Sequence, residues 1–121
     1  MGRRRSASQK DIANRINKLL KHFGVKPKIL ALMLRVSEST VKRWQKGIGA
    51  SRTDRLLTLH KLEKMMRSAQ DIFKKESSPS WYHREEPDLN MATPIDYMIK
   101  NNNGIEKVTN LIGCIKWGIY T

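Results

Sequence analysis

The side chains most capable of specific chemistry lie between residues 37 and 46. They combine hydroxyl, carboxylate and cationic groups: Ser37, Glu38, Ser39, Thr40, Lys42, Arg43 and Lys46. Lysine and arginine donate to phosphates and to guanine edges, while hydroxyl and carboxylate groups contact other base edges. This mixture therefore predicts a surface that binds nucleic acid, with an ordinary charged solvent face as the alternative.

Groups for catalysis or metal binding are scattered along the chain. The histidines show no metal-ligand spacing, and we expect His22 on the surface. The single Cys114 excludes an internal disulfide and a cysteine cluster, and we expect it buried and inert. Glu85 and Glu86 would point apart on a strand or form a solvated patch in a loop. No glycine-rich phosphate loop is present, so we expect no enzymatic activity, no metal and no cofactor.

Two short helices must position the polar groups between residues 37 and 46. The first can begin at Pro27, and its apolar side chains recur at helical spacing: Ile29, Leu30, Met33 and Leu34. Ser37 is a good N-cap for the second helix, because its hydroxyl can accept from the backbone N–H of residue 39 or 40. Val41 and Trp44 lie three residues apart and face the first helix, and Gly47 ends the second helix.

The outer face of this second helix has the dimensions and chemistry that the major groove of DNA accepts. The groove admits one helix, whose N-terminal residues reach the base edges. We expect Ser39 and Lys42 at the groove floor, with Glu38 at its rim, able to accept from a cytosine amino group. Arg43 and Lys46 are expected to hold phosphates.

The same stretch resembles the A-x-x-L-G-V-S-x-x-T-V-x-x-W-x-x-G core of Xre/Cro-type helix-turn-helix repressors. The matching residues are Ala31, Leu34, Val36, Ser37, Thr40, Val41, Trp44 and Gly47. Arg35 stands where those proteins usually have glycine, so the turn either carries strain or is built differently. Pro27 stands where a glutamine that contacts phosphate is common. The resemblance implies binding to double-stranded DNA at an operator.

The basic charge is concentrated in the N-terminal part of the chain. Residues 1–75 carry 20 Lys and Arg against 5 Asp and Glu, and residues 76–121 carry 4 against 6, within a formal net charge of +13. This asymmetry predicts two partners of different kinds. The chain has no apolar run long enough to span a membrane and no apolar signal region behind its first residues, so we expect a cytoplasmic protein without membrane contact.

Residues 1–7 are expected to form a basic flexible arm. Its side chains able to reach phosphates or a minor groove are Arg3, Arg4 and Arg5. The alternative is an unstructured start of the chain without contacts. Ser8 and Asp11 have the spacing of a capping box that opens a helix to about residue 22.

A long helix is predicted over residues 52–75, where apolar side chains recur at threes and fours. Its length favours joining two units or two chains, so this helix is the first candidate for a dimer surface. Together, residues 8–75 are predicted to form a four-helix, helix-turn-helix DNA-binding domain with a long connecting helix.

Residues 76–121 are predicted to form a small helical domain. Thr93 is an N-cap candidate followed by Pro94 at the first helical position, which predicts a helix over residues 94–100. A turn at residues 101–104 precedes a last helix with apolar spacing of three and four, and an apolar tail ends the chain. The fold class predicted for the whole chain is all-α.

This C-terminal part resembles the toxin-binding domain of Xre/MbcA/ParS-type antitoxins. The residues that carry the resemblance are Trp81, Pro87, Asp88, Leu89, Thr93, Pro94, Ile95, Asp96, Gly104, Glu106, Val108, Leu111 and Gly118. Met91 occupies a place where glycine is usual, which leaves the conformation of that turn open. The resemblance implies a RES-domain toxin that consumes NAD or uses it to modify a target, and an antitoxin end that blocks the toxin's cleft. The residues implied in toxin binding are Trp117, Ile119, Tyr120, Thr121, Asp96 and Glu106.

Two functions follow from these patterns. In the first, the chain is the antitoxin of a type II toxin-antitoxin system, which neutralises a RES-type toxin and represses its own operon. In the second, it is a stand-alone Xre-type transcriptional regulator whose C-terminal domain serves only oligomerisation. Both functions predict a homodimer, and the first also allows a larger hetero-oligomer with the toxin.

Overall fold

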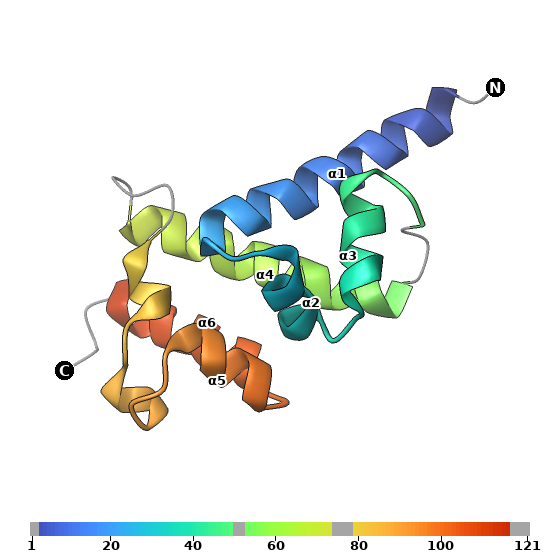
Figure 1. Ribbon diagram of the computed structural model, residues 1–121. Coiled ribbons are helices and arrows are strands. Elements are labelled where there is room, and N and C mark those ends of the chain that lie inside the picture. Colours follow the sequence, from blue (N-terminus) through green and yellow to red (C-terminus); the bar gives the residue numbers. More distant parts are fainter. Residues whose placement is uncertain (1–2, 50–52, 74–78, 117–121) are drawn as a thin grey trace. The chain divides into compact units, whose positions relative to one another are not determined.

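The computed structural model describes the backbone of residues 3–49, 53–73 and 79–116 (Figure 1). Side chains are described for residues 11–49, 56–73 and 79–116. Within these residues the secondary structure is entirely helical and contains no strand. The elements are α1 (Arg3–Phe23), α2 (Pro27–Leu34), α3 (Glu38–Gln45), α4 (Thr53–Ile72), the short 3-10 helices η1 (Ser80–His83) and η2 (Pro87–Leu89), α5 (Pro94–Lys100) and α6 (Gly104–Lys116). The predicted all-α class is confirmed. None of the described helices combines the length and hydropathy that a bilayer span requires.

The chain divides into two compact units, Met1–Leu59 and His60–Thr121. The division falls within α4, so this helix contributes to both units. The sequence pattern assigned the whole of that helix to the N-terminal part, with the change at residues 75 and 76. α4 also ends three residues before the predicted residue 75.

The N-terminal unit is built around α1, α2 and α3, with α3 packed against both of the others. Its core is the apolar stripe of α1 together with the inner faces of α2 and α3: Ile12, Ile16, Leu19, Phe23, Leu30, Ala31, Met33, Leu34, Val41 and Trp44. The α1 residues recur at threes and fours, which is the spacing of one helical face. Gln45 at the end of α3 donates its side-chain N–H to Asn17 Oδ1 on α1, at 3.3 Å.

The first helix begins earlier than the sequence pattern predicted. α1 starts at Arg3, five residues before the predicted cap at Ser8, so the expected flexible arm is wrong from Arg3 onward. Arg3, Arg4 and Arg5 belong to the first turns of α1. The physical reason is helix propensity, because arginine, alanine, glutamine and lysine all favour a helix and nothing in this stretch breaks one. Ser8 could cap a helix, but α1 continues through this residue.

His22 is buried, which corrects its predicted surface position. It is only 3% exposed, and its ring meets that of Phe23 edge-on with centroids 5.0 Å apart. His22 lies three residues after Leu19 and therefore next to the apolar stripe of α1. Burial lowers its pKa from 6.5 to about 4, so the folded protein holds the imidazole neutral at pH 7.

The stability of the protein should therefore fall between pH 6.5 and pH 4. In this window the unfolded chain protonates His22 while the folded chain does not, so acid favours unfolding by roughly 3 kcal/mol across it. Above pH 7 this contribution is constant. Urea unfolding at pH 7.5 and at pH 4.5 measures the effect, with His22→Leu as the variant that has no such group. An equal loss of stability on acidification in the variant and the native chain would contradict the prediction.

The C-terminal unit packs α5 between η1 and α6. Its buried apolar side chains come from all its elements: Leu62, Met65, Met66, Ala69, Trp81, Tyr82, Leu89, Ile95, Met98, Val108, Leu111 and Ile112. The predicted cap is confirmed, since Thr93 Oγ1 accepts from the Asp96 N–H at 3.1 Å. A Cβ at Gly104 would lie 2.6 Å from the Cα of Met98, so only glycine allows α6 to begin this close to the backbone of α5. Cys114 is half-buried and not fully buried as predicted.

Glu86 is the centre of the loop between η1 and α5, which corrects its predicted place in a solvated patch. It is 7% exposed, and its carboxylate accepts from Trp81 Nε1 at 3.2 Å and from the Asp88 N–H at 3.4 Å. Its own backbone N–H donates to Ala92 O at 3.1 Å, and its carbonyl accepts from the Met91 N–H at 3.0 Å. The loop thus closes on Glu86, because a buried carboxylate needs several donors.

The turn at Met91, whose conformation the sequence did not determine, has the backbone conformation that suits glycine. Met91 has φ of 67°, and the preceding Asn90 has φ of 57°, so two consecutive residues occupy the left-handed region. Asparagine tolerates this region, whereas methionine adopts it at a cost in backbone strain. The Met91 side chain is exposed, so it adds no packing conflict to that strain.

Candidate nucleic-acid interface

The turn between α2 and α3 consists of residues 35–37 and keeps the geometry that glycine usually provides. Arg35 adopts a left-handed conformation, with φ 62° and ψ 39°. Its N–H donates to Leu32 O, and the Val36 N–H donates to Ala31 O at 3.0 Å. These two bonds are those of a Schellman motif. Of the two alternatives for this turn, the strained one therefore holds, at a cost of about 1 kcal/mol for a residue with a Cβ.

The start of α3 is held by a cluster of hydroxyl groups. Ser37 Oγ accepts from the Thr40 N–H at 3.2 Å, which confirms the predicted N-cap. Ser37 Oγ also shares hydrogen bonds with Thr40 Oγ1 at 2.8 Å and with Ser39 Oγ at 3.0 Å. Arg43 donates from Nη2 to Thr40 Oγ1 at 3.3 Å. Thr40 is only 4% exposed, so its hydroxyl orders α3 more than it faces solvent.

The rotation of α3 about its axis follows from its two buried residues. Val41 is fully buried and Trp44 is 1% exposed, as their spacing predicted. Trp44 Nε1 donates to Gly49 O at 3.2 Å, which ties the loop after α3 to the helix. The opposite face is exposed and carries the polar groups: Glu38, Ser39, Lys42, Arg43 and Lys46.

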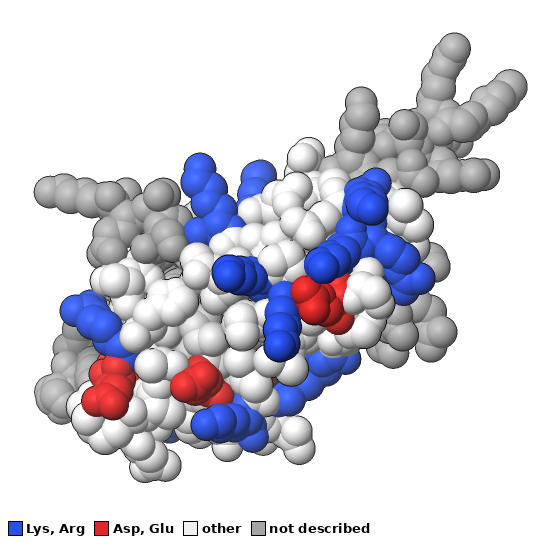
Figure 2. All heavy atoms as spheres, viewed as in Figure 1, with Lys and Arg blue, Asp and Glu red and all other residues white. Residues whose placement is uncertain are grey.

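This exposed face is mainly cationic. Figure 2 shows Lys and Arg side chains gathered over α2 and α3, with a single acidic patch among them. The acidic residue of α3 is Glu38, whose Oε2 lies 3.3 Å from Lys42 Nζ. Lys28 on α2 and Arg35 in the turn are exposed cations that the sequence interpretation did not include in the interface. Their signal was present in the sequence, since Lys28 precedes the stretch that resembles helix-turn-helix repressors and Arg35 lies within it.

The predicted toxin-binding residues are only partly described. Trp117, Ile119, Tyr120 and Thr121 lie outside the described residues, as do the side chains of the three arginines at the start of α1. Asp96 is exposed in the first turn of α5, and Glu106 is exposed in the first turn of α6.

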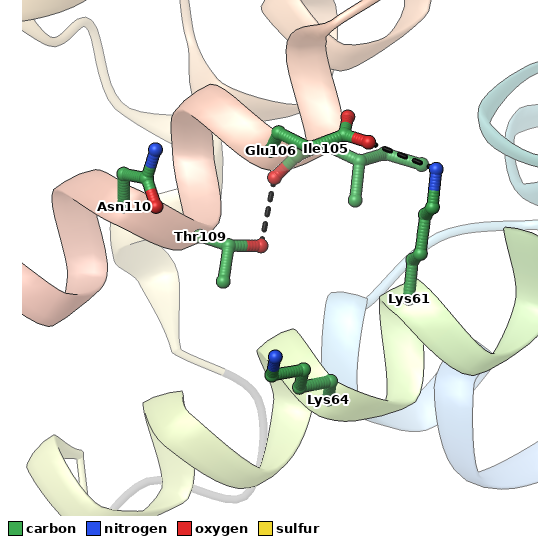
Figure 3. Close-up of a pocket in the computed structure, with 6 residues that line it drawn as sticks. All are labelled: Lys61, Lys64, Ile105, Glu106, Thr109 and Asn110. Atoms are coloured by element: carbon green, nitrogen blue, oxygen red, sulfur yellow. Dashed lines mark hydrogen bonds and ion pairs between the residues drawn. The ribbon is translucent and has the colours of Figure 1, made fainter.

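Glu106 lies at a pocket of about 280 Å³ in the C-terminal unit (Figure 3). The lining residues come from α4 and α6: Lys61, Lys64, Ile105, Glu106, Thr109 and Asn110. Lys61 Nζ donates to Glu106 Oε2 at 2.9 Å, and this hydrogen bond lowers the pKa of Glu106. Thr109 Oγ1 donates to Ile105 O at 2.7 Å within α6. The pocket thus has a mainly apolar lining surface with an ion pair between Lys61 and Glu106.

A second ion pair joins the same two helices. Lys116 Nζ lies 2.8 Å from Asp71 Oδ2, so α6 is linked to α4 near its end as well as at Glu106. Both pairs are substantially exposed, so each adds little to stability.

In the described part of the chain, no group of three or more His, Cys, Asp and Glu side chains is placed to hold a metal ion. Comparison of the chain with protein-family models, with curated proteins and with solved structures found no match. A function must therefore be argued from the residues and the geometry of this chain itself.

Proposed function

We propose that this protein binds double-stranded DNA through α3, as the recognition helix of a helix-turn-helix domain. The observation that carries the proposal is the division of α3 into a buried edge and a polar, cationic solvent face. Val41 and Trp44 fix the buried edge, and Ser39, Lys42 and Lys46 lie on the exposed face. A short helix of this kind, presented by two supporting helices, fits the major groove.

The roles proposed for the individual side chains follow from their positions on α3. Ser39 and Lys42 lie on the face opposite the core, so they reach the base edges when that face enters the groove. Arg43 lies to one side, and its guanidinium keeps further donors for phosphate beyond the one given to Thr40. Lys46 follows one turn after Lys42, where the groove wall carries the phosphate backbone.

Replacing Lys42 and Lys46 separately by alanine should have different effects on DNA binding. Lys42→Ala should weaken binding to the preferred operator by about 1–3 kcal/mol and weaken binding to random duplex much less, because a base contact is lost. Lys46→Ala should weaken both and reduce the salt dependence, because a phosphate contact is lost. Fluorescence anisotropy with operator and random duplexes at several salt concentrations measures both. Equal losses on the two DNAs for Lys42→Ala would refute this division of roles.

We further propose that the protein is the cytoplasmic antitoxin of a type II toxin-antitoxin system, neutralising a RES-type, NAD-consuming toxin and repressing its own operon. The pattern of residues in the C-terminal part supports this, as does the contrast between its slight acidity and the basic N-terminal part. Asp96 and Glu106 are both exposed, as residues that meet a partner must be. Co-purification of the full chain with the product of the adjacent gene tests the proposal.

The second candidate is a stand-alone regulator that uses its C-terminal part for assembly. Leu57 on α4 is a large apolar side chain that is 58% exposed, but it lies in the N-terminal unit, so it favours a dimer under either candidate. An exposed leucine on a long helix suits a dimer, and two copies of α3 would read two half-sites one helical turn apart. The two candidates differ in the adjacent gene: a RES-type reading frame whose product binds this chain supports the antitoxin.

A further inference from the structure

One ion pair lies on the exposed face of α3. Glu38 Oε2 lies 3.3 Å from Lys42 Nζ, and the two residues are one helical turn apart. Both side chains are exposed, and neither has another partner within the described part of the chain. The pair therefore presents to solvent a spare carboxylate oxygen beside spare ammonium hydrogens, which are an acceptor and donors at neighbouring points.

We propose that Glu38 and Lys42 together read a single G·C base pair in the major groove, an inference that rests on the DNA binding proposed above. The major-groove edge of this base pair carries two acceptors, guanine N7 and O6, followed by one donor, the cytosine amino group. The Lys42 ammonium donates to the guanine acceptors, and the Glu38 carboxylate accepts from the cytosine amino group. The acceptor and the donors of the ion pair are complementary to this edge.

Other base pairs do not offer the same edge to these two side chains. When thymine replaces cytosine, its O4 stands near the position of the amino group, and an acceptor then faces the Glu38 carboxylate. Inverting the base pair moves the donor to the other end, next to the ammonium of Lys42. Each wrong pair thus leaves a charged group without its partner in a partly desolvated groove, which is costly.

Because its charges are opposite, the pair should affect DNA binding differently from the other cations of residues 38–46. A neutral pair contributes little to attraction by the phosphates, whereas Lys46 and Arg43 attract every sequence alike. Removing the carboxylate leaves Lys42 as one more free cation, so Glu38→Gln should bind random duplex more tightly than the native chain. The same change should weaken the preference for the G·C pair. The amide oxygen of glutamine can still accept from the cytosine amino group, but it lacks the negative charge that strengthens this hydrogen bond.

The test uses the full chain and a duplex library with a randomised central region. Selection with the native chain identifies the preferred sites, and each base pair of the best site is then exchanged in turn. Affinities are measured for the native chain, Glu38→Gln, Lys42→Gln and the double variant. Lys46→Gln is the matched control, because it removes the same charge from the C-cap of α3, four residues after Lys42. Thermal melting of each variant establishes that the exposed substitutions leave the fold intact.

At one G·C position of each half-site, exchange to A·T should weaken binding by the native chain about 10-fold or more. The same exchange should cost Glu38→Gln and Lys42→Gln less than about 3-fold, and Lys46→Gln should keep the full cost. The double variant should lose no more discrimination than either single variant, since the two side chains act as a unit. Preferences that survive in both single variants, or effects that simply add in the double variant, would overturn joint reading and leave the proposed DNA binding in place. Binding to no duplex at all, selected or random, would overturn both.

Discussion

Trp44→Ala should unfold the N-terminal unit before it affects DNA recognition. Trp44 is 1% exposed, and α3, the helix that carries it, packs against both α1 and α2. Removing a buried tryptophan side chain costs about 3–5 kcal/mol, a large fraction of the stability of a small domain. The variant also loses the bond from Trp44 Nε1 to Gly49 O, which holds the loop after α3. Loss of DNA binding in this variant would therefore follow from loss of the fold.

Two companion variants separate packing from recognition. Trp44→Phe keeps most of the apolar volume but removes the indole N–H, so it should cost less than Trp44→Ala. Lys42→Ala alters the opposite face of α3 and should leave the melting temperature nearly unchanged, because Lys42 is exposed. Circular dichroism melting and urea unfolding measure all three. A Trp44→Ala chain that melts like the native protein but fails to bind DNA would mean that the indole reads DNA and that α3 is rotated differently in the complex.

The orientation of α3 could be predicted from the sequence because it depends on short-range spacing. Val41 and Trp44 are separated by three residues, and Ser37 precedes the helix at the N-cap, so the local pattern determines which face is buried. The Thr93 cap of α5 was predictable for the same reason. The all-α class followed likewise from apolar periodicity along each segment.

The residues whose burial was predicted wrongly are those that other parts of the chain cover. Glu86 is buried because Trp81 donates to it and because the loop returns to it at Ala92, and no local pattern marks those contacts. His22 is buried because the packed unit covers the edge of the stripe on α1. The pocket beside Glu106 likewise depends on Lys61, which is 45 residues away in sequence. Helical spacing reveals which face is apolar, but it does not reveal how far the core extends at its edges.

The candidate interface on α3 was predictable in part. The spacing of Val41 and Trp44 placed Lys42 and Lys46 on the exposed face, where the structure has them. The pairing of Glu38 with Lys42 is also local, being one turn of helix, but its consequence for base reading depends on the absence of other partners for either side chain in the described structure. That fact required the folded chain, because a neighbouring element in contact with either group would have occupied it.

Deleting residues 119–121 should abolish protection against the proposed toxin and leave operator binding nearly intact. Ile119 and Tyr120 are two large, mainly apolar side chains within these three residues. Aromatic side chains are enriched at interface hot spots, so Tyr120 suits a surface that binds a partner. The described contacts of α6 are all N-terminal to the deletion. The last of them, between Lys116 and Asp71, is therefore kept in the truncated chain.

Co-expression of the truncated chain with the toxin, beside an operator-binding assay, tests this expectation. The matched control is Lys116→Ala, which removes the ion pair to Asp71 but keeps the end of the chain. That control should still protect cells, because an exposed ion pair contributes little to stability. The N-terminal unit carries the cationic face of α3, so the deletion should not weaken operator binding. Survival of cells with the truncated chain would show that the end of the chain is not what blocks the toxin. Loss of both activities would mean instead that residues 119–121 are needed for the fold.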